Sequence, residues 1–245
     1  MKAMEIIKNG TIGKVTRVDY RMYAGYQTLG GWNVPMKANL WRLTEKANYK
    51  SPTLFDDGYH KHSVISWMLD EPIEAVMTWL GKYQVKLGGV PTPIIWDSPS
   101  NVTYICKNKS HYATWSQSTQ DFFPMHTDYY NCDEYMDVIG EKGAIFIPGC
   151  TGSWYKQCEA GPGKEGVHWC TEDGKWHSDT TMNSDWKQSF INCSRHFIES
   201  LRTGKQLQLS PTDAKYILQI ALAVVKSSRE NFRLVKIKEI VDGVG

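Results

Sequence analysis

The stretch NVTYICKNKSHYATWSQST, residues 101–119, decides the fold class, because two β-rich runs in it flank a short polar turn. The runs are residues 101–106 and 111–119, and the turn is centred on Asn108-Lys109-Ser110. Strand-forming residues on both sides of such a turn are typical of a β-hairpin. We therefore expect two antiparallel neighbours in a sheet here.

Two further hairpins are predicted downstream of this one. Residues 130–139 and 144–147 flank a turn at Gly140-Glu141-Lys142-Gly143, and residues 167–170 and 175–177 flank Asp173-Gly174. An aspartate followed by glycine is a strong turn signal between two strands. Consecutive hairpins indicate a sheet that is antiparallel or mixed, rather than the parallel sheet of a βαβ chain.

The remaining segments place helices around this sheet. A helix end at residues 1–8 is closed by Asn9-Gly10, and Ser210-Pro211 followed by Asp213 marks the start of a late helix. The other expected elements are a strand at 12–23, a helix at 54–69, a strand at 73–83, a helix at 185–202 and a final strand at 232–240. This order predicts an α+β fold, with an open, mainly antiparallel mixed sheet and helices packed on one face. We expect residues 1–245 to form one domain.

Composition excludes several classes of protein. Hydrophobic residues make up 41% of the chain and charged residues 22%, with a net charge of +2, so no basic footprint points to nucleic acid. No apolar run is long enough to span a bilayer, and no secretory signal is visible. The six cysteines form no CxxC pair, which favours reduced thiols. We therefore expect a cytoplasmic chain that binds neither membrane nor nucleic acid.

The candidate chemistry lies at Asp56 and His60, which are four residues apart and would share a face of the predicted helix. A carboxylate beside an imidazole suits a general base. Three alternatives remain open from spacing alone. The pair can be an ordinary surface contact, which is the commoner outcome. Asp56, His60, His62 and His126 can be metal ligands, although no known ligand spacing supports this. A cysteine nucleophile lacks a histidine at a recognisable spacing.

Aromatic content offers a second hint about the ligand. Ten Trp and thirteen Tyr give flat apolar surfaces with polar edges, on which sugar rings can stack. An aromatic-rich core or interface explains them equally well. A nucleotide site is missing, because no GxGxxG follows a strand and no P-loop is present.

Five segments, taken in order, make the chain similar to a known family over roughly residues 1–228. They are EIIKNGTIGKV at 5–15, Trp41-Arg42, LFDDGYHKHSVISWMLDEPIEAV at 54–76 with its D-x-G-x-H core, EYMDVIGEKGAIFIP at 134–148 and FIESLRTGKQLQLSPTDA at 197–214. The chain resembles the C-terminal domain of the Gfo/Idh/MocA oxidoreductases, the group of glucose–fructose oxidoreductase and inositol dehydrogenase. In such enzymes a Rossmann domain precedes an open, mainly antiparallel sheet.

The resemblance implies a function that the spacing alone leaves open. It implies the catalytic half of an NAD(P)-dependent sugar or polyol dehydrogenase, with His60 taking the hydroxyl proton and Asp56 holding the substrate or tuning the pair. The substrate-binding residues that we assign beside them are Trp41, Arg42, Tyr59 and His126. NAD or NADP would be bound mainly by a domain that this chain lacks, so the chain alone is expected to be inactive. The family's glycine-rich loop and E-K-P stretch have no counterpart, and residues 150–182 match no family pattern.

Two partners follow from this interpretation. One is a Rossmann domain, supplied by a longer chain or by a separate subunit. The other is a second copy of the chain, because helices can cover only one sheet face and the other should then carry Trp and Tyr as an apolar patch. On the strand at 111–119 we expect Thr114, Ser116 and Ser118 on one face and Ala113, Trp115 and Gln117 on the other. The competing hypothesis is a non-catalytic carbohydrate-binding or oligomerisation module.

Overall fold

The computed structural model describes residues 1–25, 41, 49, 51–87, 90–120, 132–148, 166–182 and 186–242. Its helices are α1 (Lys2–Lys8), η2 (Pro52–Asp57, a π-helix), α3 (Gly58–Leu69), α5 (Trp186–Thr203), α6 (Pro211–Arg229) and α7 (Lys238–Asp242). Its strands are β1 (Val15–Gly25), β2 (Ile73–Leu80), β3 (Tyr83–Leu87), β4 (Val90–Trp96), β5 (Ser100–Cys106), β6 (Tyr112–Gln120), β7 (Cys132–Gly140), β8 (Gly143–Ile147), β9 (Val167–Thr171), β10 (Trp176–Asp179) and β11 (Val235–Lys236).

Nine of these strands form one open sheet in the order β10-β9-β8-β7-β1-β6-β5-β2-β11. All neighbours are antiparallel except β1 and β6, which run parallel, so the sheet is mixed as expected. The three predicted hairpins are β5–β6, β7–β8 and β9–β10. The predicted α+β fold with an open, mainly antiparallel sheet is confirmed.

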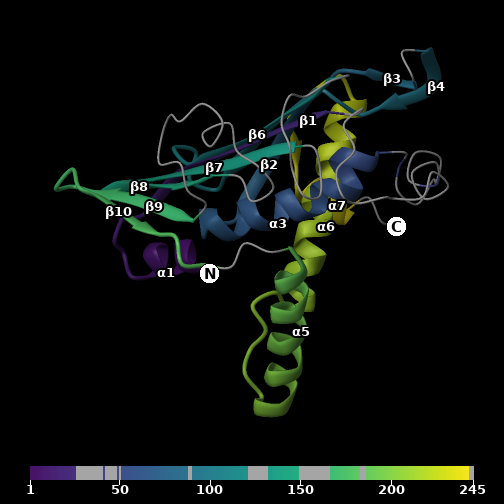
Figure 1. The fold of residues 1–245 in the computed structure, drawn as a ribbon. Coiled ribbons are helices and arrows are strands. Elements are labelled where there is room, and N and C mark those ends of the chain that lie inside the picture. The colour runs from purple at the N-terminus through teal and green to yellow at the C-terminus, as the bar shows by residue number, and fades with distance from the viewer. Residues whose placement is uncertain are drawn as a thin grey trace.

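The hydrophobic core lies between the sheet and the helices α1, α3 and α6, which pack on one side of it (Figure 1). Alternation along the strands decides which side chains enter this layer. Val18 of β1 and Trp115 of β6 are fully buried there, together with Ile65 of α3 and Ile220 of α6. The predicted division of β6 is therefore confirmed, with Ala113, Trp115 and Gln117 on the helix side.

The helix caps also follow the sequence signals. Gly10 has φ +74°, the left-handed conformation that ends α1. Ser210 and Asp213 form a reciprocal capping box at the start of α6, in which the Ser210 hydroxyl accepts from the Asp213 amide and the Asp213 carboxylate accepts from the Ser210 amide. No helix in the described part of the chain combines the length and the apolar character needed to cross a bilayer.

One predicted element was wrong, and two others are present with different details. The final strand at 232–240 is only β11, two residues paired with β2, and then the chain turns into α7. Glu239 explains the change, because its carboxylate accepts from the Lys236 amide and from the Arg233 guanidinium, which favours a helical turn. The helix at 54–69 starts as the π-helix η2, and the strand at 73–83 ends at Leu80, followed by the unpredicted hairpin β3–β4.

The other sheet face was expected to carry Trp and Tyr as an apolar patch, and it is mixed instead. Trp115 faces the helices, and the side chains that alternate with the core residues include Asp19, Arg21 and Thr114. Thr114 donates a hydrogen bond of 2.6 Å to the Asp19 carboxylate. Tyr23 and Tyr135 lie on the same face, with the Arg21 guanidinium over their rings, and the exposed apolar residues there include Met77 and Trp79 on β2 and Ile139 on β7. The face therefore combines charged and hydroxyl groups with aromatic and aliphatic side chains.

Candidate active site

The candidate residues Asp56 and His60 lie at the junction of η2 and α3. Asp56 is half-buried at the end of the π-helix, and His60 is exposed in the first turn of α3. The Ser51 carbonyl accepts from the Phe55 amide at 3.2 Å and from the Asp56 amide at 3.3 Å, which is the wider turn of a π-helix. Single π-turns are rare and are frequent at functional sites. The backbone at this junction therefore has a geometry that is typical of functional sites.

Asp97, which precedes β5, holds the start of the π-helix. Its carboxylate accepts from the Ser51 hydroxyl at 2.6 Å, from the Thr53 amide at 3.0 Å and from the Leu54 amide at 2.8 Å. Burial raises the pKa of Asp97, and these donors act against that rise. The side chain thus caps a helix start more than forty residues away in sequence. It fixes the backbone from which Asp56 projects.

His62 contacts the same turn from the hydrophobic core. Its Nε2 lies 2.9 Å from the Leu54 carbonyl and its Nδ1 lies 2.8 Å from the Tyr104 hydroxyl. A carbonyl can only accept, so Nε2 carries the proton and Nδ1 accepts from Tyr104. The ring is fully buried, edge-on to Trp115, and burial lowers the pKa of His62 to about 4. His62 is therefore a neutral core residue that ties the π-turn to β5.

Glycine is required at position 58 because neighbouring atoms leave no room for a Cβ. A Cβ at this position would lie 2.7 Å from the Thr53 carbonyl oxygen and 3.2 Å from the Trp115 ring. The φ of Gly58 is −59°, so its backbone is one that any residue can adopt. Size, rather than backbone freedom, explains the glycine of the D-x-G-x-H motif.

Asp57, the residue after Asp56, belongs to an ion cluster around the buried Lys61. The Lys61 ammonium lies 2.8 Å from the Asp57 carboxylate and 3.2 Å from the Glu134 carboxylate on β7. Burial disfavours the charge of Lys61, but Glu134 and Asp57 keep its pKa well above the usual range. Successive residues of a helix point in different directions, so Asp57 serves this cluster while Asp56 lies on another side of the turn.

The other predicted site residues have mixed outcomes. The Tyr59 hydroxyl donates to the Ala214 carbonyl at 3.0 Å, so it fastens α3 to α6. Trp41 is 53% exposed. Arg42 and His126 lie outside the described residues. The alternative metal set does not converge, because both His62 nitrogens are engaged in the core and, within the described ranges, no three His, Cys, Asp or Glu are grouped to hold a metal.

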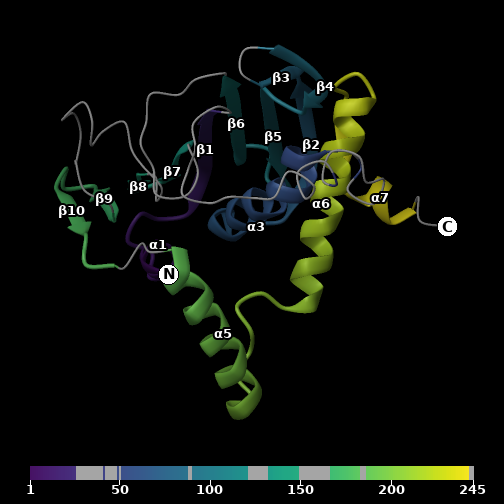
Figure 2. The same cartoon turned by 45° about the vertical axis from the view of Figure 1, so that its right-hand side comes forward.

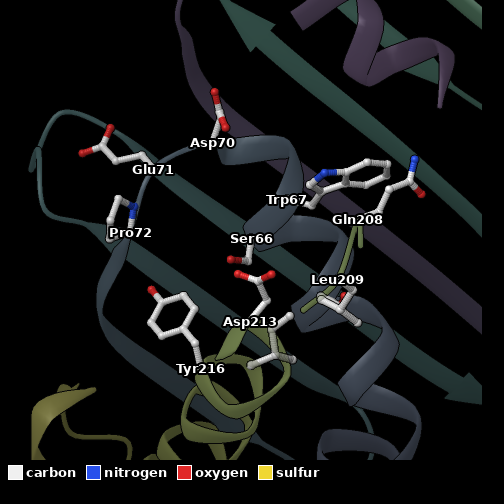
Figure 3. Close-up of a pocket in the computed structure, with 11 residues that line it drawn as sticks. Ser66, Trp67, Asp70, Glu71, Pro72, Gln208, Leu209, Asp213 and Tyr216 are labelled. Atoms are coloured by element: carbon white, nitrogen blue, oxygen red, sulfur yellow. The ribbon is translucent and has the colours of Figure 1, made fainter. Parts of the chain in front are cut away.

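Sequence reasoning missed a cavity of about 450 Å³ between the C-terminal half of α3 and the start of α6. Figure 3 shows Ser66 and Trp67 on α3, with Asp213 and Tyr216 on α6. The lining residues are Ser63, Ser66, Trp67, Asp70, Glu71, Pro72, Gln208, Leu209, Asp213, Tyr216 and Ile217. Asp56 and His60 are not among them. Trp67 and Asp213 come from segments distant in sequence, so no local motif marks this cavity.

One carboxylate of this lining is already engaged. Glu71 lies 2.6 Å from His111 Nδ1, and this hydrogen bond lowers the pKa of Glu71. Lys14 lies 3.6 Å from the same carboxylate. Glu71 therefore belongs to a partly buried ion cluster and offers little unpaired charge to the cavity.

A comparison with protein families finds that residues 1–146 match the model described as the GFO/IDH/MocA C-terminal domain. The chain belongs to this oxidoreductase family. A comparison with curated proteins finds no match.

Solved structures of oxidoreductases share the fold of this family member. Levoglucosan dehydrogenase in complex with NADH is 14% identical, with a TM-score of 0.70, and the match covers 96% of this chain and 62% of that one. The same enzyme with NADH and L-sorbose matches at the same identity and TM-score, over 96% and 61%. An oxidoreductase from Agrobacterium radiobacter in complex with NAD⁺, L-tartaric acid and magnesium is 11% identical, with a TM-score of 0.70, over 98% and 61%. The chain thus spans about three fifths of the length of these neighbours.

The residues of this family member do not fit a dinucleotide by themselves. A nucleotide's pyrophosphate needs a glycine-rich turn that leads from a strand into a helix N-terminus. The sequence contains one GxGxxG, GPGKEG at 161–166, but it leads into the strand β9 rather than into a helix. The described passage from β11 into α7, Val235 to Lys238, contains no glycine. Neither passage supplies the strand–turn–helix arrangement that a pyrophosphate needs.

Proposed function

We propose that this chain is the substrate-binding and catalytic half of an NAD(P)-dependent dehydrogenase that acts on a sugar or polyol. A nucleotide-binding Rossmann domain, in a longer chain or a separate subunit, completes the enzyme. NAD or NADP would bind mainly to that domain. The chain's membership of the family and its structural neighbours with NADH or NAD⁺ support the general class.

The observation that carries this proposal is the contrast between a fixed backbone and an exposed imidazole at the η2–α3 junction. Asp97 and His62 both hydrogen-bond to the backbone of the π-turn, at the Leu54 amide and the Leu54 carbonyl respectively. At Gly58 the neighbouring atoms leave no room for a Cβ. His60 is exposed on the same junction. Catalytic groups work best on a rigid backbone that holds them in one geometry. A surface contact of no function would not need such support.

The proposed roles use only proton chemistry of this chain. His60 accepts the proton of the substrate hydroxyl, and Asp56 holds a neighbouring hydroxyl or orients the imidazole. Trp41, Arg42, Tyr59 and His126 would line the substrate site. For Tyr59 that contact would come from the ring, since its hydroxyl is bonded to α6. A sugar or polyol substrate agrees with a neighbour solved with L-sorbose.

The cavity beside Trp67 favours a second candidate, a carbohydrate-binding module without catalysis. An indole, two serine hydroxyls and carboxylates are groups on which a sugar can stack and hydrogen-bond. Such a module would need neither Asp56 nor His60.

The test uses a fusion in which the part of levoglucosan dehydrogenase that this chain does not cover precedes Met1. We first confirm NADH binding by the fusion, and then assay NAD⁺ reduction with a panel of sugars and polyols. His60→Ala should reduce kcat by about 10²–10⁴-fold, since it removes a general base. Asp56→Asn should also slow turnover. His177→Ala, an exposed histidine on β10, is the matched control and should leave turnover unchanged. Equal turnover in the His60→Ala fusion would remove His60 from the mechanism and favour the binding module.

A further inference from the structure

The cavity between the C-terminal half of α3 and the start of α6 is separate from the proposed catalytic junction. Its volume is about 450 Å³, which is within the range typical of small-molecule sites. Figures 1 and 2 show α3 and α6 side by side on the helix-covered face of the sheet. Neither Asp56 nor His60 lines this space. We call it the Trp67 cavity, after the indole in its lining.

The apolar walls of the Trp67 cavity are held in place by contacts with the core. Ile217 is buried, and the half-buried Trp67 packs against the hydrophobic core. The Tyr216 hydroxyl accepts a hydrogen bond of 2.6 Å from the Ile73 amide and donates one of 2.9 Å to the Ile73 carbonyl. A ligand would therefore meet a preformed apolar surface, and little ordering of these side chains would oppose its binding.

The charged groups that line the cavity are all carboxylates. They belong to Asp70, Glu71 and Asp213, and no lysine, arginine or histidine is among the described lining residues. A hydrogen bond from Ser210 lowers the pKa of Asp213, and one from His111 lowers the pKa of Glu71, so both stay ionised near neutral pH. The cavity therefore carries a negative potential, which disfavours phosphates and other anions as ligands.

Asp70 is the lining carboxylate with the most capacity for a new partner. It ends α3 in the left-handed conformation at φ +50°, and within the described ranges no hydrogen bond or ion pair engages its side chain. Glu71, by contrast, is bonded to His111 and lies 3.6 Å from Lys14. The C-terminus of a helix carries partial negative charge, and the last turn of α3 has no basic residue to offset it. The end of α3 therefore favours a cation.

The groups in this lining suit an organic cation better than a metal ion. Among the described residues no three His, Cys, Asp or Glu side chains are grouped to hold a metal, so the carboxylates of the cavity do not converge on one point. The Trp67 ring can hold a cation over its face, and the Ser63 and Ser66 hydroxyls can hydrogen-bond to polar substituents. We infer that the Trp67 cavity is a second ligand site of this chain, which binds a small protonated amine. This site does not depend on the roles proposed for Asp56 and His60.

Two matched pairs of probes test the requirement for a charged amine. They are glucosamine against glucose, and 1,5-diaminopentane against 1,5-pentanediol, in which a hydroxyl replaces each amine. The full chain is labelled with ¹⁵N at tryptophan, and the Trp67 indole N–H signal is identified by its loss in Trp67→Phe. An amine should shift this signal and bind roughly fivefold more tightly than its neutral partner, which is the contribution of a good exposed ion pair. Which of the two amines binds then distinguishes an amino sugar from an alkyl amine.

Two variants locate the charge recognition. Asp70→Asn should weaken binding of the amine by roughly twofold to fivefold and leave the neutral probes unaffected. Asparagine tolerates the left-handed conformation, so the end of α3 should keep its structure in this variant. The matched control is Glu172→Gln, which removes an exposed carboxylate in the turn between β9 and β10 and should bind the amine as the wild type does.

Three outcomes would overturn the inference. Equal affinity for the amines and their neutral partners would assign the cavity to uncharged sugars. A Trp67 signal that no probe shifts at millimolar concentration would show that the cavity is not a site for these ligands. Amine binding that is the same in Asp70→Asn as in the wild type would place the recognition of charge elsewhere. None of these readouts involves turnover, so they are separate from the test of His60.

Discussion

Replacing His62 with glutamine is expected to remove a distinct component of the pH dependence of folding. His62 is fully buried, and burial lowers its pKa from 6.5 to about 4. At pH values between about 4 and 6.5, the His62 imidazole is protonated in the unfolded chain and neutral in the folded chain. The free energy of unfolding therefore falls as the pH drops through about 6.5, and the loss is complete below about 4.

The magnitude follows from the size of the shift. A shift of about 2.5 pKa units corresponds to about 3 kcal/mol in total, and about 2.5 kcal/mol of this is lost between pH 7.5 and pH 4.5. Glutamine can keep both hydrogen bonds, because its amide can donate to the Leu54 carbonyl and accept from the Tyr104 hydroxyl. It has no titrating group, so the component disappears.

Urea unfolding followed by tryptophan fluorescence at a series of pH values measures the effect. All carboxylates are common to both proteins, so the difference between the two curves isolates His62. The variant should be less stable than the wild type at pH 7.5, by about 1–2 kcal/mol for the lost ring packing on Trp115, and should approach or exceed it at pH 4.5. His177→Gln, at an exposed position, should follow the wild-type curve. Parallel curves for His62→Gln and wild type would refute the reasoning.

Three other predictions concern the same fold. Gly58→Ala should lower the free energy of unfolding by about 1–3 kcal/mol in urea titrations, since its Cβ would meet the Thr53 carbonyl at 2.7 Å; an unchanged midpoint would show that the turn can relax. Asp97→Ala should lower it by about 2–4 kcal/mol, because three donors lose their acceptor, and Asp97→Asn should cost less. The isolated chain should show no binding of NADH by calorimetry, and micromolar binding would contradict the need for a separate nucleotide-binding domain.

Local signals account for the parts of the fold that the sequence predicted correctly. Each hairpin is specified by its own turn, such as Asp173-Gly174, and the start of α6 by Ser210 and Asp213 within four residues. The end of the chain was wrong because its structure depends on contacts beyond the local pattern. Alternating residues at 232–240 indicated a strand, but β2 pairs with only two of them and Glu239 stabilises the turn that follows.

At the candidate site, too, the local residues could be predicted from the sequence and their distant contacts could not. The D-x-G-x-H motif made Asp56 and His60 the candidates, because both lie within one segment. The supports of that segment come from elsewhere: Asp97 precedes β5 and Tyr104 lies on it. A sequence pattern carries no information about such distant partners. The π-turn could not be predicted for this reason, since the cap that holds it is far away in the chain.

The sheet face opposite the helices determines which groups would meet if two copies of the chain packed through it. On the sheet face, Arg21 lies 4.6 Å from the Tyr23 ring centroid and 3.6 Å from that of Tyr135, and Asp19 is bonded to Thr114. Copies that pack through this face would have to match charges and hydroxyls, so salt should weaken their contact. A dimer whose dissociation constant is the same at low and high salt would contradict this expectation.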